Sequence, residues 1–238
     1  MALVLAVDTS GSVSPSRFEL QKQGYAAAFR NPQVLNAIRE QASQSIAAVM
    51  VQWTGPRLHI VAVDWRIIRD AGSAEAFANA IEAVPRQLFG GGTSISGAID
   101  YSRLLLTQCP CHPVRRVIDI SGDGANNSGR SVIEARDEAI KDGLSINGLP
   151  ILAIEPGLDR YYFDNVIGGP GAFMIPAANY DTFADAVLKK LISEIAGIDA
   201  RSARSSARDV KRTMASQTRQ SSQPSSPYSE ASGANIAR

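Results

Sequence analysis

Six short apolar segments, rich in β-branched residues, alternate with stretches of helical periodicity over the first 197 residues. They are residues 3–7, 45–53, 58–65, 114–120, 146–154 and 172–175. Strands that alternate with helices form a mostly parallel sheet covered by helices on both faces. The second and third segments are too close in sequence for a parallel crossover, so that pair is expected to be antiparallel. The pattern predicts a doubly wound α/β fold with six strands and one antiparallel edge strand.

The segments between these strands carry recognisable helix starts. Ser14 and Pro15 are suited to the N-cap and the first turn of a helix. Further helices are expected over 74–84, from Ser94 onward and over 131–142. The last helix places apolar residues three to five positions apart between Phe183 and Ile195, which indicates a face packed on the sheet.

The composition changes after Gly197 to Ser, Arg, Gln, Ala and Pro. A segment with so few large apolar residues cannot bury enough surface to offset the entropy cost of ordering. We therefore expect one domain over residues 1–197 and a disordered tail over 198–238. Residues 199–238 carry seven Lys or Arg and three Asp or Glu, so a short basic helix that touches an acidic surface is the alternative.

Charge and hydropathy exclude several classes of protein. The formal net charge of the chain is +1, which gives no domain-wide basic surface for nucleic acid. No apolar run approaches the roughly 20 residues of a transmembrane helix, and the first residues lack the features of a signal peptide. The sequence as given is thus expected to be soluble. Because the first strand begins almost at Met1, the compartment stays open, and a periplasmic or secreted location would follow from a missing presequence.

The two cysteines, Cys109 and Cys111, flank a proline and precede His112. They are too close in sequence to link distant parts of the fold. We interpret the segment as a loop. A metal site built from these three side chains is the alternative, although a closed zinc site usually has four ligands.

Three polar loops are expected where ligands bind in an open parallel sheet, beyond the carboxyl ends of its strands. Asp8, Ser10 and Ser12 follow the first strand, Thr93 ends a run of three glycines, and Asp123 follows the strand at 114–120. Together they offer two carboxylates and three hydroxyls. Such small oxygen ligands suit a hard divalent cation, Mg²⁺ or Mn²⁺.

The order and spacing of these five residues resemble the metal-ion-dependent adhesion site of von Willebrand factor type A domains. The resemblance covers about residues 2–197 and implies a Rossmann-like sheet. It also implies that the three hydroxyls bind the metal directly, and that the two carboxylates bind it directly or through water. Residues 117–127, 146–151 and 166–171 are similar to a bacterial branch of these domains whose function is unknown.

The resemblance implies a protein-binding module and not an enzyme. Two carboxylates neutralise a divalent cation only formally, and neutral hydroxyls add no charge, so the metal stays electrophilic at an open coordination position. A partner protein's Asp or Glu is the expected occupant of that position.

Other interpretations of the same residues remain. Each of the five site residues could instead have a purely structural role, because serines and threonines cap helices and Asp123 is suited to a turn. The main enzymatic alternative is a magnesium-dependent phosphotransferase or phosphatase that uses Asp8. That chemistry places a second carboxylate two residues later, where this chain has Ser10. A scaffold whose site has lost its metal is a third alternative.

Several polar residues outside the five have less specific interpretations. Asp119 lies inside an apolar strand, where we expect a structural role or support of the site. Asn126 and Asn127 are expected to shape the loop beside the metal or to contact a partner. His59 and His112 are distant from the motifs, so neither is expected to be catalytic.

Overall fold

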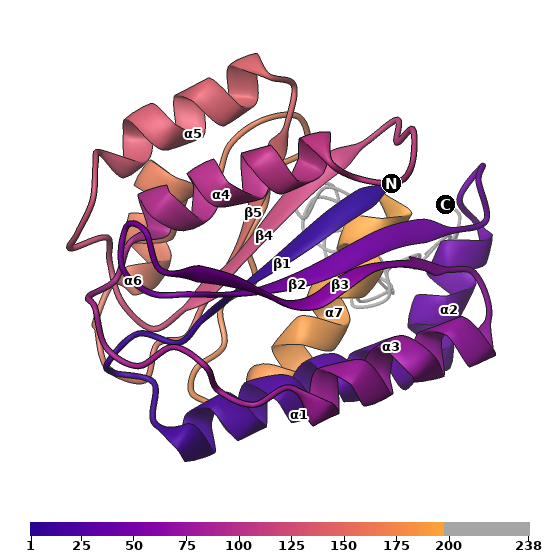
Figure 1. The fold of residues 1–238 in the computed structure, drawn as a ribbon, viewed down its shortest axis with the longest axis horizontal. Coiled ribbons are helices and arrows are strands. Elements are labelled where there is room, and N and C mark those ends of the chain that lie inside the picture. Colours follow the sequence, from indigo (N-terminus) through magenta and orange to yellow (C-terminus); the bar gives the residue numbers. More distant parts are fainter. Residues whose placement is uncertain (198–238) are drawn as a thin grey trace, which may run out of the picture. The chain divides into compact units, whose positions relative to one another are not determined.

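The computed structural model describes residues 1–197, and the predicted tail lies outside the described residues. A five-stranded sheet with the order β3-β2-β1-β4-β5 forms the centre of the domain (Figure 1). The strands are β1 (Ala2–Asp8), β2 (Ile46–Trp53), β3 (His59–Ile68), β4 (Arg116–Gly122) and β5 (Ser145–Pro150). The helices are α1 (Pro15–Arg30), α2 (Pro32–Arg39), α3 (Ala71–Ala83), α4 (Ile95–Thr107), α5 (Val132–Lys141), α6 (Leu158–Tyr161), the π-helix η1 (Tyr162–Val166) and α7 (Phe183–Ala196).

The sheet is parallel except at one edge. Strand β1 pairs in parallel with β2 and with β4, and β4 pairs in parallel with β5. Strand β3 pairs with β2 in the antiparallel direction and forms an edge of the sheet. The predicted fold class, with its antiparallel edge strand, is therefore confirmed.

The prediction of a sixth strand was wrong. Residues 172–175 form no strand and make a single isolated bridge, between Met174 and Gly148. Gly171, just before the segment, has a positive φ of 67°, and Pro176, just after it, has no backbone N–H to donate to a ladder. The apolar character of the segment instead reflects packing: Phe173 is buried.

Helices cover both faces of the sheet. Figure 1 shows α4 and α5 on one side, and α1 and α3 on the other. Alternate residues of β1 belong to different cores, because neighbouring side chains of a strand point to opposite faces. Leu3 and Leu5 pack with residues of α1, α3 and α7, whereas Val4 and Ala6 pack with residues of α4 and α5. A strand buried on both faces is apolar throughout, as the sequence of β1 is.

The helix starts follow local capping signals. Ser14, Ser94 and Ser131 each accept a hydrogen bond from a backbone N–H in the first turn, as expected for N-caps. Helix α3 begins earlier than expected because Asp70 forms a capping box with Ser73. Helix α2 was not predicted. Within residues 1–197, no helix combines the length and the apolar character needed to cross a membrane.

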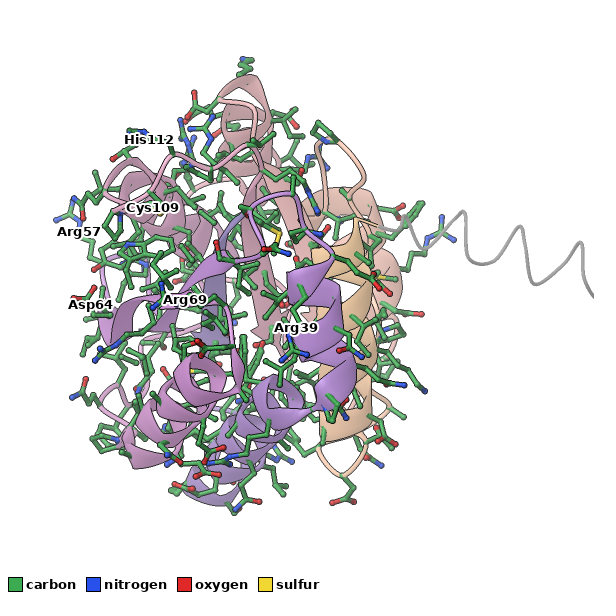
Figure 2. The ribbon with its side chains drawn as sticks, turned by 90° about the vertical axis from the view of Figure 1, so that its right-hand side faces the viewer. Arg39, Arg57, Asp64, Arg69, Cys109 and His112 are labelled. Carbon is green, nitrogen blue, oxygen red and sulfur yellow. A yellow bond between two sulfur atoms is a disulfide. The ribbon has the colours of Figure 1, made fainter. Side chains whose placement is uncertain are left out.

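The two cysteines form a disulfide in the loop between α4 and β4. Cys109 and Cys111 are joined, and Figure 2 labels Cys109 and the neighbouring His112. The loop interpretation is confirmed. A metal site at this loop is excluded in this oxidised form, because the bonded sulfurs are not free thiolates.

Candidate metal centre

The first polar loop begins at the last residue of β1. Asp8 is fully buried there, and the backbone N–H of Ser10 donates a hydrogen bond of 2.6 Å to Asp8 Oδ1. The hydroxyl oxygens of Ser10 and Ser12 are 3.2 Å apart. The loop thus places one carboxylate and two hydroxyls within a few ångströms.

The third polar loop meets the first. Asp123 follows β4 directly and is 1% exposed. Its Oδ1 accepts a hydrogen bond of 2.5 Å from the hydroxyl of Ser12, and its Oδ2 accepts one of 2.8 Å from the hydroxyl of Tyr180. Strands β1 and β4 are parallel neighbours, so the residues after them emerge at the same edge of the sheet.

The glycine-rich loop brings Thr93 to the same edge. Gly90, Gly91 and Gly92 all have positive φ, a conformation that favours glycine. Asn127 fixes the end of this loop: its side-chain oxygen accepts a hydrogen bond from the N–H of Thr93, and its own N–H donates to the carbonyl of Thr93. The expectation that Asn127 shapes the loop is confirmed.

The three loops surround a cavity of about 360 Å³. It is lined by Gly11, Ser12, Gly90, Gly91, Gly92, Thr93, Asp123, Gly124, Ala125, Asn127, Ile154 and Glu155. Three of the five predicted site residues therefore line the cavity, whereas Asp8 and Ser10 are buried and do not line it.

A larger hollow, of about 570 Å³, lies elsewhere on the domain. Arg39 and Arg69, both exposed and labelled in Figure 2, belong to its lining, and none of the five predicted site residues does. None of the three polar loops contributes to its lining, so its larger size does not make it part of the candidate metal centre.

Two buried carboxylates dominate the electrostatics of the site. Burial raises the pKa of Asp8 to about 7; the N–H of Ser10 acts in the opposite direction, and the Asp123 carboxylate adds to the rise. Asp8 Oδ2 has no hydrogen-bond partner in the part of the chain that the structure describes. The Arg17 guanidinium is 3.8 Å from Asp123 Oδ2. A divalent cation beside both carboxylates would favour their charged forms.

The donor set fits a hard cation. The five side chains offer only oxygen, and over residues 1–197 no group of three or more His, Cys, Asp or Glu is placed to hold a metal ion. Hydroxyls, two carboxylates and water are ligands that Mg²⁺ and Mn²⁺ accept, while zinc sites are usually built from Cys and His.

Three residues near the site were not predicted. Tyr180 bonds to Asp123, and the Arg17 guanidinium lies over the Tyr180 ring, 5.2 Å from its centre. Glu155 lines the cavity and accepts a hydrogen bond of 2.7 Å from the N–H of Ala125. Arg17 is close to the first loop in sequence, but Tyr180 and Glu155 carry no local signal.

Asp119 has a structural environment. Its side chain is 1% exposed, and Lys190 Nζ of α7 is 2.5 Å from its Oδ1. Lys190 is also 3.4 Å from Glu194. Burial raises the pKa of Asp119 to about 7, although the Lys190 ammonium acts in the opposite direction. The three side chains join β4 to α7 through the core.

The sequence of the whole domain matches one family. A family described as a protein of unknown function, DUF1194, matches residues 1–199. The chain belongs to the DUF1194 family. A comparison of this DUF1194 chain with curated proteins gives no match.

Solved structures with the same fold include three informative ones. Proximal thread matrix protein 1 from the mussel byssus, solved with a zinc-occupied MIDAS motif, is 16% identical with a TM-score of 0.58, over 83% of this chain and 45% of that one. The pilus adhesin SpaC from Lactobacillus rhamnosus GG is 15% identical with a TM-score of 0.57, over 82% of this chain and 30% of the adhesin. BatB from Bacteroides thetaiotaomicron is 18% identical with a TM-score of 0.52, over 82% of this chain and 98% of BatB.

These likenesses establish the fold of the DUF1194 domain. A von Willebrand factor type A domain from Catenulispora acidiphila has the same fold, as the sequence resemblance implied, with 15% identity and a TM-score of 0.56 over 82% of this chain and 42% of that one. The chain spans less than half the length of the mussel matrix protein and of the adhesin. At identities of 15 to 18%, these structures show that the fold is shared, but they do not show which ligands this chain binds.

Proposed function

We propose that this DUF1194 domain is a metal-dependent protein-binding module. The proposed metal ligands are Asp8, Ser10, Ser12, Thr93 and Asp123. The observation that carries the proposal is the meeting of the first and third loops, where Ser12 donates a hydrogen bond to Asp123 across 111 positions of the sequence. Ser12, Asp123 and Thr93 line one cavity, and Asp8 keeps a buried oxygen without a donor among the described residues.

The proposed metal is Mg²⁺ or Mn²⁺. Mg²⁺ takes six oxygen ligands in near-octahedral geometry and usually keeps water. The Tyr180 hydroxyl and the Ser12 hydroxyl now occupy the two oxygens of Asp123, so metal binding there proceeds through the remaining lone pairs, through water, or by displacing these donors.

The proposed partner is a protein that presents an Asp or Glu side chain to the metal. A cation with two carboxylates and neutral hydroxyls around it remains an acceptor for a further anionic oxygen. The cavity between the loops gives such a side chain access. The solved relatives include a matrix protein with a zinc-occupied MIDAS motif and a pilus adhesin, which supports a binding role of this kind.

The phosphotransferase alternative has less support from the site. A nucleophilic carboxylate must reach its substrate, but Asp8 is fully buried and does not line the cavity. No acid/base carboxylate stands two residues later, where the chain has Ser10. We therefore propose a binding function and no catalysis.

Affinity capture on the immobilised full chain tests the binding role. Partners are expected to be retained with Mg²⁺ present and released by EDTA. The Thr93→Ala variant is expected to retain less of the same partners. Retention that survives both EDTA and a Thr93→Ala, Asp123→Ala double variant would move the interaction to another surface. Magnesium-dependent hydrolysis of p-nitrophenyl phosphate, lost in Asp8→Asn, would favour the enzyme instead.

A further inference from the structure

Two buried polar atoms without hydrogen-bond partners face the same small space behind the proposed metal centre. They are Asp8 Oδ2 and the hydroxyl of Tyr162, and neither has a partner within residues 1–197. A Cβ added to Gly122 would stand 2.9 Å from the Asp8 oxygen and 3.1 Å from the Tyr162 hydroxyl. Gly122 is the last residue of β4, directly before Asp123.

Two glycines on neighbouring strands make room for the tyrosine. Tyr162 begins the π-helix η1, and its ring crosses β5 at Gly148, where an added Cβ would stand 2.7 Å from the ring carbon Cδ1. Gly148 lies opposite Ile120 in the β4–β5 ladder, and Ile120 is two positions before Gly122 on β4. The ring thus passes over one glycine and ends at the other. π-Helical turns are rare and occur frequently at functional sites.

The two atoms are chemically complementary. Tyr162 and Asp8 are both fully buried. A buried hydroxyl without an acceptor and a buried carboxylate oxygen without a donor each destabilise the fold, and such groups are nearly always paired with protein or with an ordered water. A hydroxyl can donate the hydrogen that the carboxylate oxygen lacks. A hydrogen bond between them, direct or through one buried water, would satisfy both groups.

We propose that Tyr162 is a positioning residue for Asp8, and this inference rests on the proposed metal-binding function. The Tyr162 hydroxyl donates to Asp8 Oδ2, directly or through one buried water. The N–H of Ser10 already holds Oδ1 at 2.6 Å, so both oxygens of the carboxylate are then fixed. Each oxygen has a second lone pair, which leaves the carboxylate free to bind the metal or its water.

A purely structural role for the tyrosine makes a different prediction, and Tyr25 provides the matched control. Tyr25 is also fully buried, and its hydroxyl donates a hydrogen bond of 3.2 Å to Ser121, which is not a proposed ligand. Tyr162→Phe and Tyr25→Phe each remove one buried hydroxyl and leave the ring in place. Only the first removes a group that faces Asp8.

Calorimetric titration of the full chain with Mg²⁺ and with Ca²⁺ tests the inference. Tyr162→Phe is expected to weaken Mg²⁺ binding by roughly tenfold or more, the usual effect of losing a group that orients a metal ligand. Ca²⁺ binding is expected to fall less, because Ca²⁺ accepts more irregular coordination. The preference for Mg²⁺ over Ca²⁺ therefore declines in this variant. Tyr25→Phe is expected to keep the wild-type affinities, and thermal unfolding in EDTA shows that both variants are folded.

The outcomes separate this inference from the function on which it rests. If the wild type binds Mg²⁺ and Tyr162→Phe keeps both its affinity and its preference for Mg²⁺, the role of Tyr162 is overturned and the metal centre stands. If Tyr25→Phe weakens Mg²⁺ binding as much as Tyr162→Phe does, the effect is one of packing, and the role of Tyr162 is again overturned. Absence of Mg²⁺ binding by the wild type overturns the metal centre and the role of Tyr162 together.

Discussion

The hydroxyl of Ser12 donates a hydrogen bond of 2.5 Å to Oδ1 of Asp123, although 111 positions separate the two residues in the chain. The contact exists because β1 and β4 are parallel neighbours whose carboxyl ends lie at one edge of the sheet. The hydrogen bond joins the first and third polar loops. A direct contact of this kind preorganises two parts of a binding site, which lowers the entropy cost of binding.

Thr93 is expected to contribute to metal binding without supporting the core. Thr93→Ala removes one oxygen from the cavity wall and leaves the backbone bonds to Asn127 in place. We predict weaker Mg²⁺ binding in calorimetry and a thermal midpoint in EDTA close to that of the wild type. Thr107→Ala, which removes an exposed hydroxyl bonded only to the carbonyl of Leu104, is the control. Equal affinities in all three proteins would remove Thr93 from the ligand set.

Gly148 is expected to tolerate no side chain. In Gly148→Ala the new methyl would stand 2.7 Å from the Tyr162 ring and 3.1 Å from Ile167 Cγ2. Overpacking of this kind costs about 1 to 3 kcal/mol in the free energy of unfolding. Gly72 of α3 provides the contrast, because its added Cβ would meet nothing closer than 3.7 Å, and Gly72→Ala is expected to stabilise by about 0.5 to 1 kcal/mol. Urea unfolding measures both, and a neutral Gly148→Ala would contradict the packing described here.

The contribution of Asp119 to the free energy of unfolding is expected to fall as pH rises from about 4 to about 7. Burial raises the pKa of Asp119 from 3.8 to about 7, so over this range the folded state holds a proton that the unfolded state has released. Asp119→Asn removes that titration and leaves Lys190 beside Glu194. Urea unfolding in EDTA at several pH values is expected to give a flatter profile for Asp119→Asn than for the wild type. Parallel profiles would assign the slope to other groups, of which Asp8 is the first.

The tail remains a prediction from composition. Residues 198–238 lack the apolar side chains that could dock on a core. A fragment of residues 1–197 is expected to unfold as cooperatively as the full chain, at the same urea midpoint. A marked loss of cooperativity or a lower midpoint would show that the tail contributes to the fold.

The sequence predicted what depends on neighbouring residues. Ser14 and Pro15 identify the start of α1 by local capping chemistry, and the apolar run of β1 identifies a strand buried on both faces. The meeting of the loops of Asp8 and Asp123 followed from the rule that parallel strands end at one edge. The first two predictions need no knowledge of distant contacts, and the third rests only on the common direction of the strands in a parallel sheet.

The sequence did not predict what depends on packing between distant segments. The apolar residues 172–175 matched a strand, but continuous pairing depends on the glycine and proline residues on either side of them. Tyr180 and Tyr162 reach Asp123 and the space beside Asp8 from segments that follow β5, and neither belongs to a recognisable motif. Their roles become visible only when the buried hydrogen-bond donors and acceptors are paired in space.

The most direct test of the metal centre is calorimetric titration of the full chain with Mg²⁺. We predict binding by the wild type and no measurable binding by an Asp8→Ala, Asp123→Ala double variant. An Asp64→Ala, Asp185→Ala double variant removes the same number of charges from exposed positions and is expected to bind as the wild type does. Equal Mg²⁺ binding by the wild type and the Asp8→Ala, Asp123→Ala variant would contradict the metal centre proposed here.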